Sequence, residues 1–104
     1  MARLHKLPSL TVIIPTLNEA LHLPLLLADL NQWPYDFEII IIDGGSKDLT
    51  ISIAQIQGIN VINSHQNNRG YQLKLGALNA SSNWMLFIHA DSRLEQSWVK
   101  SLYK

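Results

Sequence analysis

Four short apolar runs recur along the 104-residue chain, each followed by polar or turn-forming residues. They occupy residues 10–14, 38–42, 60–63 and 84–88. Their short length and their content of β-branched and aromatic residues are typical of strands. The four consecutive isoleucines at 39–42 indicate a strand buried on both faces, as occurs at the centre of a parallel sheet.

The segments between these runs have the spacing of helices. Pro24 suits a first helical turn, and the leucines around it recur at helical intervals: Leu23, Leu26, Leu27 and Leu30. A second helix is expected between a cap at Ser46 and an end at Gly58, with Leu49, Ile53 and Ile56 facing inward. A third is expected from Gly70 to Asn79, burying Leu73, Ala77 and Ala80. A fourth is expected to begin near Glu95.

This alternation of strands and helices predicts an α/β fold. The expected architecture is Rossmann-like, with a mostly parallel sheet of about four strands and helices on both faces. The length fits one domain, residues 1–104. Asp43 and Asp91 each follow a predicted strand, and ligands of open α/β sheets bind beyond the carboxyl ends of the strands. We therefore expect a site for hydroxyls, a base or a metal with phosphates, the alternative being that both acids form turns or caps.

The composition excludes several classes of protein. Hydrophobic residues make up 47% of the chain and charged residues 15%, which argues against disorder. Eight basic residues balance eight acidic ones without a basic cluster, so nucleic acid is not an expected partner. The absence of cysteine excludes disulfides and thiolate metal sites. With neither a signal peptide nor a transmembrane segment apparent, the expected location is the cytoplasm.

Three motifs in order carry a resemblance to a known family. They are Thr11-Val-Ile-Ile-Pro-Thr-Leu-Asn-Glu19, then Glu38-Ile-Ile-Ile-Ile-Asp43 with Gly44-Gly-Ser-Lys-Asp48, and Phe87-Ile-His-Ala-Asp-Ser92. Together they resemble the start of family 2 glycosyltransferases, which are inverting enzymes of the GT-A fold that use nucleotide-sugar donors. The similarity is greatest to the soluble bacterial branch whose strand-end motif reads His-Ala-Asp.

The resemblance implies a donor site on the first two strand ends. The segment containing Pro15, Thr16, Asn18 and Glu19 would wrap the nucleoside, with Glu19 near the base or ribose. Asp43 would accept a hydrogen bond from the imide N–H of uracil, or from another base in a similar position, and a UDP-type donor is expected. The family often has a second aspartate next to it, where this chain has Gly44.

The resemblance also implies a site for the donor's diphosphate. Asp91 would bind a divalent metal, Mn²⁺ or Mg²⁺, that bridges to the phosphates. His89, in the place of the usual first acid, would contact ribose or phosphate, or only pack. Arg69 would contact the base or diphosphate, or else be a solvated loop residue.

The general base of an inverting transfer lies after the metal motif in this family, and the chain matches no such motif. We therefore expect residues 1–104 to be the donor-binding part of a glycosyltransferase, lacking the acceptor half and inactive alone. The acceptor is unknown. One alternative is a non-catalytic nucleotide-binding module or a truncated relic. A nucleotidyltransferase would need a Gly-rich loop after the first strand, and a dinucleotide-binding domain would need Gly-X-Gly-X-X-Gly there. The chain has neither after its first strand, so both classes are disfavoured.

The last predicted strand is expected to have an uncovered outer edge. Exposed strand edges and apolar patches favour association. Self-association through this edge is therefore a further expectation.

Overall fold

The computed structural model describes residues 10–32 and 36–94, which form an alternating α/β unit. Its elements in chain order are β1 (Thr11–Thr16), α1 (Leu23–Leu30), β2 (Glu38–Asp43), α2 (Thr50–Ile56), β3 (Asn60–Asn63), α3 (Arg69–Asn79) and β4 (Met85–Phe87). All paired strands are parallel, in the order β3-β2-β1-β4. The predicted fold class and element order are confirmed. The helix expected near Glu95 lies outside the described residues.

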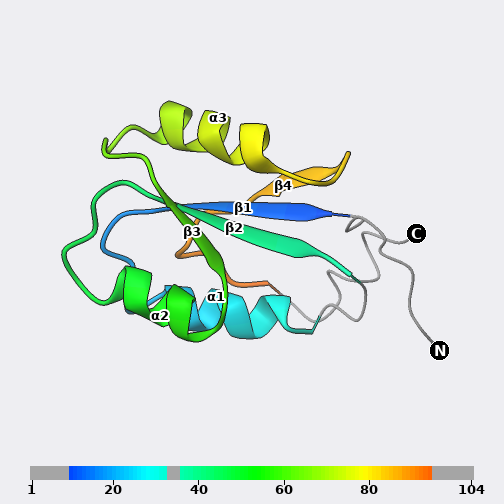
Figure 1. The fold of residues 1–104 in the computed structure, drawn as a ribbon. Helices are drawn as coiled ribbons and strands as arrows, with labels where there is room; N and C mark the ends of the chain where they lie inside the picture. The colour runs from blue at the N-terminus through cyan, green and yellow to red at the C-terminus, as the bar shows by residue number, and fades with distance from the viewer. Residues whose placement is uncertain (1–9, 33–35, 95–104) are drawn as a thin grey trace.

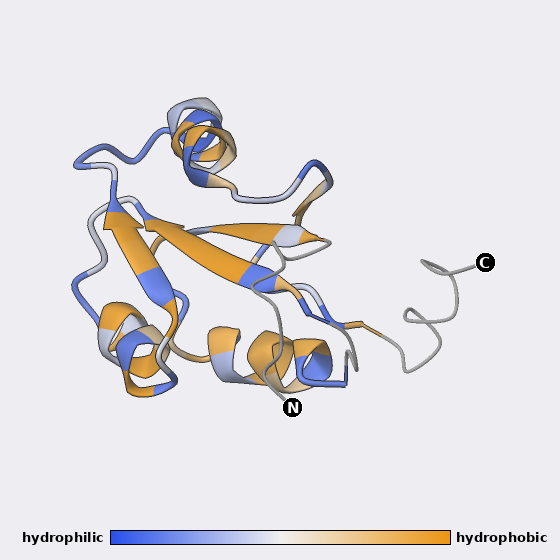
Figure 2. Ribbon diagram, turned by 45° about the vertical axis from the view of Figure 1, so that its right-hand side comes forward, coloured by the Kyte–Doolittle hydropathy of each residue, from blue (hydrophilic) through white to orange (hydrophobic). Residues whose placement is uncertain are grey.

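Helices cover both faces of the sheet (Figure 1). α3 packs on one face, where Leu73 and Leu75 contact the side chains of Ile13, Ile40 and Ile42. α1 and α2 cover the other face, and all four predicted leucines of α1 are buried there. Colouring by hydropathy shows the apolar strands between these layers (Figure 2).

The central strand β2 is deeply buried. Of the four isoleucines predicted to be buried, Ile40, Ile41 and Ile42 are fully buried, whereas Ile39 is half-buried. Burying one such side chain contributes about 1.5–3 kcal/mol. β2 therefore provides a rigid base, and Asp43 is its last residue.

β1 is longer than predicted, because Pro15 and Thr16 belong to the strand and not to a loop. Along β1 the odd-numbered residues bond toward β4, as when Ile13 accepts from Ile88 N–H at 3.1 Å. Pairing with β4 ends at Ile13. Pro15, which has no N–H to donate, therefore faces a side where no strand partner is paired with it, and a proline is tolerated there.

The prediction for the second helix was wrong in two respects. Ser46 does not cap it, because α2 begins at Thr50 and has Leu49 in the cap position. Thr50 and Ala54, one turn apart, are its buried residues, and Ile53 packs beside them. Leu49 and Ile56 are 67% and 85% exposed, because Leu49 precedes the helix and Ile56 lies away from the face formed by Thr50 and Ala54.

α3 approaches the sheet more closely than its predicted apolar stripe implied. Its fully buried positions are Gln72 and Gly76, whereas Leu73, Ala77 and Ala80 are half-buried. A Cβ on Gly76 would lie 2.3 Å from Cγ2 of Ile13. Glycine at this position therefore sets the distance between the helix and the strand.

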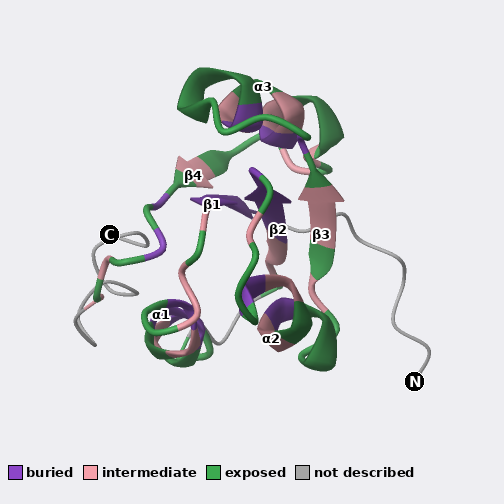
Figure 3. Ribbon diagram, turned by 90° about the vertical axis from the view of Figure 1, so that its left-hand side faces the viewer, coloured by how far each residue is buried: buried purple, intermediate pink, exposed green. Residues whose placement is uncertain are grey.

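β4 forms an edge of the sheet, and its residues are coloured intermediate or exposed in Figure 3. Trp84, Met85 and Phe87 are 74%, 42% and 47% exposed. Among the described residues no strand pairs with the outer side of β4, as expected, while self-association remains a prediction. Within residues 10–32 and 36–94, no helix is long and apolar enough to cross a membrane.

Candidate functional site

A cleft of about 550 Å³ opens at the carboxyl ends of the strands. Its walls come from the end of β1, the loop after it and the start of α3: Pro15, Thr16, Leu17, Glu19, Asn67, Arg69 and Gln72. Four of the residues predicted from the sequence therefore line one cavity. A second cavity, of about 390 Å³, lies near the start of β2 at the opposite end of the sheet. It contains none of the predicted site residues.

Asp43 does not line this cleft; it is fully buried and hydrogen-bonded to Thr16, which does. Its Oδ1 accepts from the hydroxyls of Thr16 (2.8 Å) and Ser46 (2.6 Å). Its Oδ2 accepts from the backbone N–H groups of Gly45 (3.0 Å) and Ser46 (2.7 Å). A carboxylate offers about four acceptor positions, and all four are used within the chain. A base would have to displace the Ser46 hydroxyl or share its position to contact Asp43.

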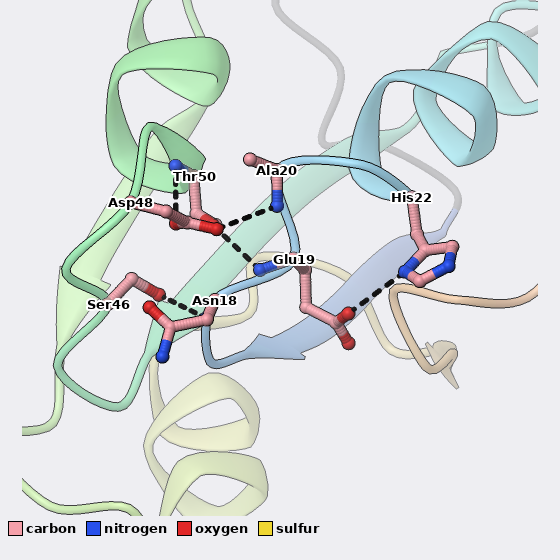
Figure 4. A network of polar contacts seen from close by, with 7 residues as sticks. All are labelled: Asn18, Glu19, Ala20, His22, Ser46, Asp48 and Thr50. Carbon is pink, nitrogen blue, oxygen red and sulfur yellow. Dashed lines mark hydrogen bonds and ion pairs between the residues drawn. The ribbon is translucent and has the colours of Figure 1, made fainter.

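The loop between β1 and α1 is fastened to the loop between β2 and α2 (Figure 4). Asn18 and Glu19 donate their backbone N–H groups to the hydroxyls of Ser46 and Thr50, each at 2.8 Å. The Glu19 side chain points the other way, and its Oε1 lies 3.3 Å from Nδ1 of His22. The sequence suggested no role for His22.

Arg69 and His89 meet across the gap between α3 and the segment that follows β4. The Arg69 guanidinium donates to Nδ1 of His89, which must be the acceptor because arginine has no acceptor atom. Both side chains are exposed. A pocket of about 40 Å³ lies between them and Pro15. This is where the strand order reverses between β1 and β4, the usual place for a ligand in such sheets.

Asp91 is exposed, on a turn closed by a bond from Ser92 N–H to the carbonyl of His89 at 3.0 Å. The residues after the turn are anchored to α1, because Arg93 and the Leu94 N–H donate to the carboxylate of Asp29. The described residues contain no group of three side chains able to enclose a metal ion. Asp91 would therefore fit a divalent metal only as one ligand among oxygens supplied by a bound substrate and water.

Sequence reasoning missed the contribution of Gln72. Its buried side-chain amide donates to the carbonyls of Thr16 (3.1 Å) and Ile42 (2.7 Å), which ties α3 to the ends of β1 and β2. A glutamine one turn before Gly76 on the buried face of a helix was the available signal. Leu17, which belongs to the first motif but was assigned no role of its own, also lines the cleft. Asn67 lines it as well, and no pattern in the sequence marked that residue.

The chain is similar to known glycosyltransferases in sequence and in fold. The chain is 36% identical over 97 residues to the "PGL/p-HBAD biosynthesis glycosyltransferase" of Mycobacterium bovis, a match covering 86% of this chain and 38% of that enzyme. Among solved structures, S. aureus TarS 1–349 with UDP-GlcNAc superposes with a TM-score of 0.83 at 22% identity, covering 91% of this chain and 30% of TarS.

A second structure is the mannosyltransferase PcManGT of Pyrobaculum calidifontis, in complex with GDP-Man and Mn²⁺. It superposes with a TM-score of 0.78 at 20% identity, over 88% of this chain and 30% of that protein. These two structures show the GT-A fold. The family model described as "Glycosyl transferase family 2" matches residues 11–104. The chain therefore belongs to glycosyl transferase family 2.

Proposed function

We propose that this chain forms the donor-binding part of an inverting glycosyltransferase that takes its sugar from a nucleoside diphosphate. The observation that carries the proposal is the cleft at the carboxyl ends of the strands, with Arg69 in its wall and Asp91 exposed near the same edge. A nucleoside diphosphate needs both a wall for the base and ribose and charged groups for the phosphates. This edge of the sheet offers both.

The nucleoside would lie along the β1 end of the cleft. Pro15, Thr16 and Glu19 line this part, with Asn18 in the same loop. Asp43 would bind the base by a hydrogen bond, either directly or through the Ser46 hydroxyl that donates to it. TarS with UDP-GlcNAc supports a uridine donor and PcManGT with GDP-Man a guanosine donor, so both bases enter the test.

The diphosphate would lie toward α3 and the turn after β4. The Arg69 guanidinium, held by His89, suits phosphate oxygens through its planar array of donors. Asp91 would hold a divalent metal together with phosphate oxygens, as the Mn²⁺ complex of PcManGT supports. When bound there, such a metal offsets the charge that grows on the departing nucleoside diphosphate.

We also propose that residues 1–104 alone do not transfer sugar. An inverting transfer needs a carboxylate to take the proton of the acceptor hydroxyl. Asp43 is buried and saturated with donors, and Asp91 is assigned to the metal. The chain spans 38% of the mycobacterial relative's length. We therefore assign the acceptor site and the general base of a whole enzyme to the part of such relatives that has no counterpart in this chain.

Calorimetric titration of the chain with UDP and with GDP, each with and without Mn²⁺, tests the proposal. We expect one nucleotide to bind more tightly than the other, and Mn²⁺ to increase its affinity. A chain that melts cooperatively and binds neither nucleotide would overturn the proposal. Nucleotide binding together with release of sugar from UDP-GlcNAc onto an added acceptor would contradict the proposed inactivity.

A further inference from the structure

Three consecutive backbone N–H groups in the loop after β1 are each bound by a side chain of the neighbouring loop. The three donors and acceptors are Asn18 to Ser46 Oγ at 2.8 Å, Glu19 to Thr50 Oγ1 at 2.8 Å, and Ala20 to Asp48 Oδ2 at 3.1 Å (Figure 4). A fourth bond runs the other way, from the Lys47 N–H to Oδ1 of Asn18 at 2.8 Å. We call this set of bonds the loop latch.

The latch is held rigid on the side of α2. Thr50 is fully buried, and both its backbone N–H and its hydroxyl donate to Oδ1 of Asp48. The hydroxyl proton is thereby directed to Asp48, which leaves an oxygen lone pair of Thr50 for the Glu19 N–H. Asn18 has a φ of 54°, in the left-handed region that asparagine tolerates better than most residues. The latch offsets the cost of that conformation.

Consecutive N–H groups that point the same way commonly form a concavity that binds an anion. In this chain side-chain oxygens already accept a hydrogen bond from each of the three N–H groups. The loop is therefore not available to take phosphate, and an arriving anion would meet the Asp48 carboxylate. This places the donor's phosphates at the Arg69 side of the cleft and assigns this loop to the nucleoside.

We infer that Asp48 and Thr50 are positioning residues that hold Leu17 and Glu19 as a preformed wall of the nucleotide cleft. Neither residue lines the cleft, whereas Leu17 and Glu19 do. The Glu19 side chain points away from the latch, so the latch can be altered without removing a group from the cleft. A wall ordered before binding spares the ligand the cost of ordering it. This inference rests on the proposed nucleotide binding.

Thr50→Val is the sharpest variant, because valine keeps the size of the side chain and removes its hydroxyl. We expect UDP affinity to fall by about tenfold, the equivalent of one lost hydrogen bond plus the ordering of the loop. Thr50→Ser restores the hydroxyl and is expected to restore affinity. In Asp48→Asn, either orientation of the amide sets its NH₂ against one backbone N–H, of Ala20 or of Thr50, so a similar loss is expected.

Thr11→Val is the matched control. Thr11 is also fully buried and also donates its hydroxyl to a carboxylate, that of Glu38 at 2.9 Å, but at the opposite end of the sheet. We expect this variant to lower stability comparably while leaving UDP affinity unchanged. All variants are titrated with whichever of UDP and GDP binds the wild-type chain more tightly, and the effects stated for UDP apply to that nucleotide. The titrations are made at a temperature where melting curves show the variants folded, and Asp48→Asn replaces Thr50→Val if the latter does not fold.

The two hypotheses fail in different ways. If the folded wild-type chain binds neither UDP nor GDP, the proposed function fails and the inference with it. If wild type binds, and Thr50→Val and Asp48→Asn bind equally well, only the inference is overturned. Weakened binding that Thr50→Ser does not restore, or that Thr11→Val reproduces, would also overturn it, because the loss would then reflect stability alone.

Discussion

Arg93 and Asp29, which lie 64 positions apart, form a two-pronged ion pair between the segment after β4 and helix α1. Nε of Arg93 is 2.9 Å from Oδ2 of Asp29, and Nη2 is 3.1 Å from Oδ1. The backbone N–H of Leu94 donates to the same carboxylate at 2.8 Å. Ala90, on the other side of Asp91, is buried. The turn that carries Asp91 is thus fixed at both ends, and its position depends on α1.

Replacing Asp29 by alanine should weaken metal-dependent nucleotide binding. Without the carboxylate, Arg93 and the Leu94 N–H lose their acceptor, and the turn carrying Asp91 is anchored at one end only. Arg93→Lys keeps the charge but not the two-pronged geometry, so a smaller loss is expected. The measurement is UDP affinity with and without Mn²⁺, and Lys74→Ala, at an exposed position of α3, serves as control. An unchanged response to Mn²⁺ in Asp29→Ala would contradict the prediction.

Stability should fall in acid through Asp29 and Asp48. The hydrogen bond from Arg93 lowers the pKa of Asp29 below 3.8, and the hydrogen bond from Thr50 lowers the pKa of Asp48. Because each folded-state pKa lies below the unfolded value, the stabilisation is present above pH 3.8 and is lost as the pH falls through the lowered pKa. Urea unfolding of wild type and of the Asp29→Asn, Asp48→Asn double variant would measure it.

The difference in unfolding free energy between these two proteins should be constant near neutral pH and shrink below about pH 4. A difference that grows on acidification would show that the sign of the linkage is wrong.

Gly76→Ala should destabilise the chain. The added Cβ would lie 2.3 Å from Cγ2 of Ile13 and 3.2 Å from two further atoms of the same buried side chain, so α3 must move away from the sheet. Overpacking of this kind costs about 1–3 kcal/mol.

Gly70→Ala is the control on the same helix, because its Cβ would meet only Oδ1 of Asn68 at 3.5 Å. There the higher helix propensity of alanine should make the change neutral or slightly stabilising, by up to about 1 kcal/mol. Equal stabilities of the two variants in urea would refute the close approach.

The strands and the layer order could be predicted because local pattern determines them. Consecutive isoleucines at 39–42 favour a strand that is buried on both faces. Leucines at helical spacing in α1 favour a helix that is buried on one face. The start of α2 could not be predicted this way. Ser46 looks like a helix cap, yet its hydroxyl donates to Asp43 and accepts from the Asn18 N–H, both contacts with other elements. Tertiary hydrogen bonds of this kind leave no periodic signal.

The same reasoning explains the outcome at the candidate site. The sequence predicted that Asp43 would lie at the carboxyl edge of the sheet, and it is the last residue of β2. The binding roles of Asp43 and Arg69 stay predictions. The sequence could not show that Thr16 and the loop after β2 fill every acceptor position of Asp43, nor that Arg69 contacts His89. Those contacts depend on side-chain direction across segments up to 27 residues apart.

Asp43→Asn and Asp91→Asn should separate a structural role from a binding role. Asp43→Asn removes a charged acceptor at a fully buried position. An NH₂ group in place of Oδ2 would face the backbone N–H groups of Gly45 and Ser46, and in place of Oδ1 it would require the hydroxyls of Thr16 and Ser46 to turn their protons elsewhere. Hydrogen bonds to a charged group contribute about 1.5–3 kcal/mol, so a loss of that order in the free energy of unfolding is expected. UDP affinity should fall both with and without Mn²⁺.

Asp91→Asn should behave in the opposite way. Asp91 is exposed, so its replacement should leave the free energy of unfolding nearly unchanged and remove the increase in UDP affinity that Mn²⁺ produces. If neither variant changes nucleotide affinity, these two residues are not part of a donor site.

The open edge of β4 should make the chain associate with itself. Met85 and Phe87 of β4, and Trp84 just before it, expose apolar surface. The outer side of β4 has no paired neighbour among the described residues, and unpaired edges can pair with further strands. Sedimentation should then show a mass that rises with protein concentration. Met85→Lys sets a charge on this edge, and lysine is a common way of blocking such pairing, so this variant should remain a monomer. Ile56→Lys replaces a side chain that is 85% exposed on α2, away from the edge, and should associate as wild type does.

A wild-type chain that stays monomeric as its concentration is raised would refute the prediction. Equal loss of association in both variants would point to general repulsion between charged chains as the cause.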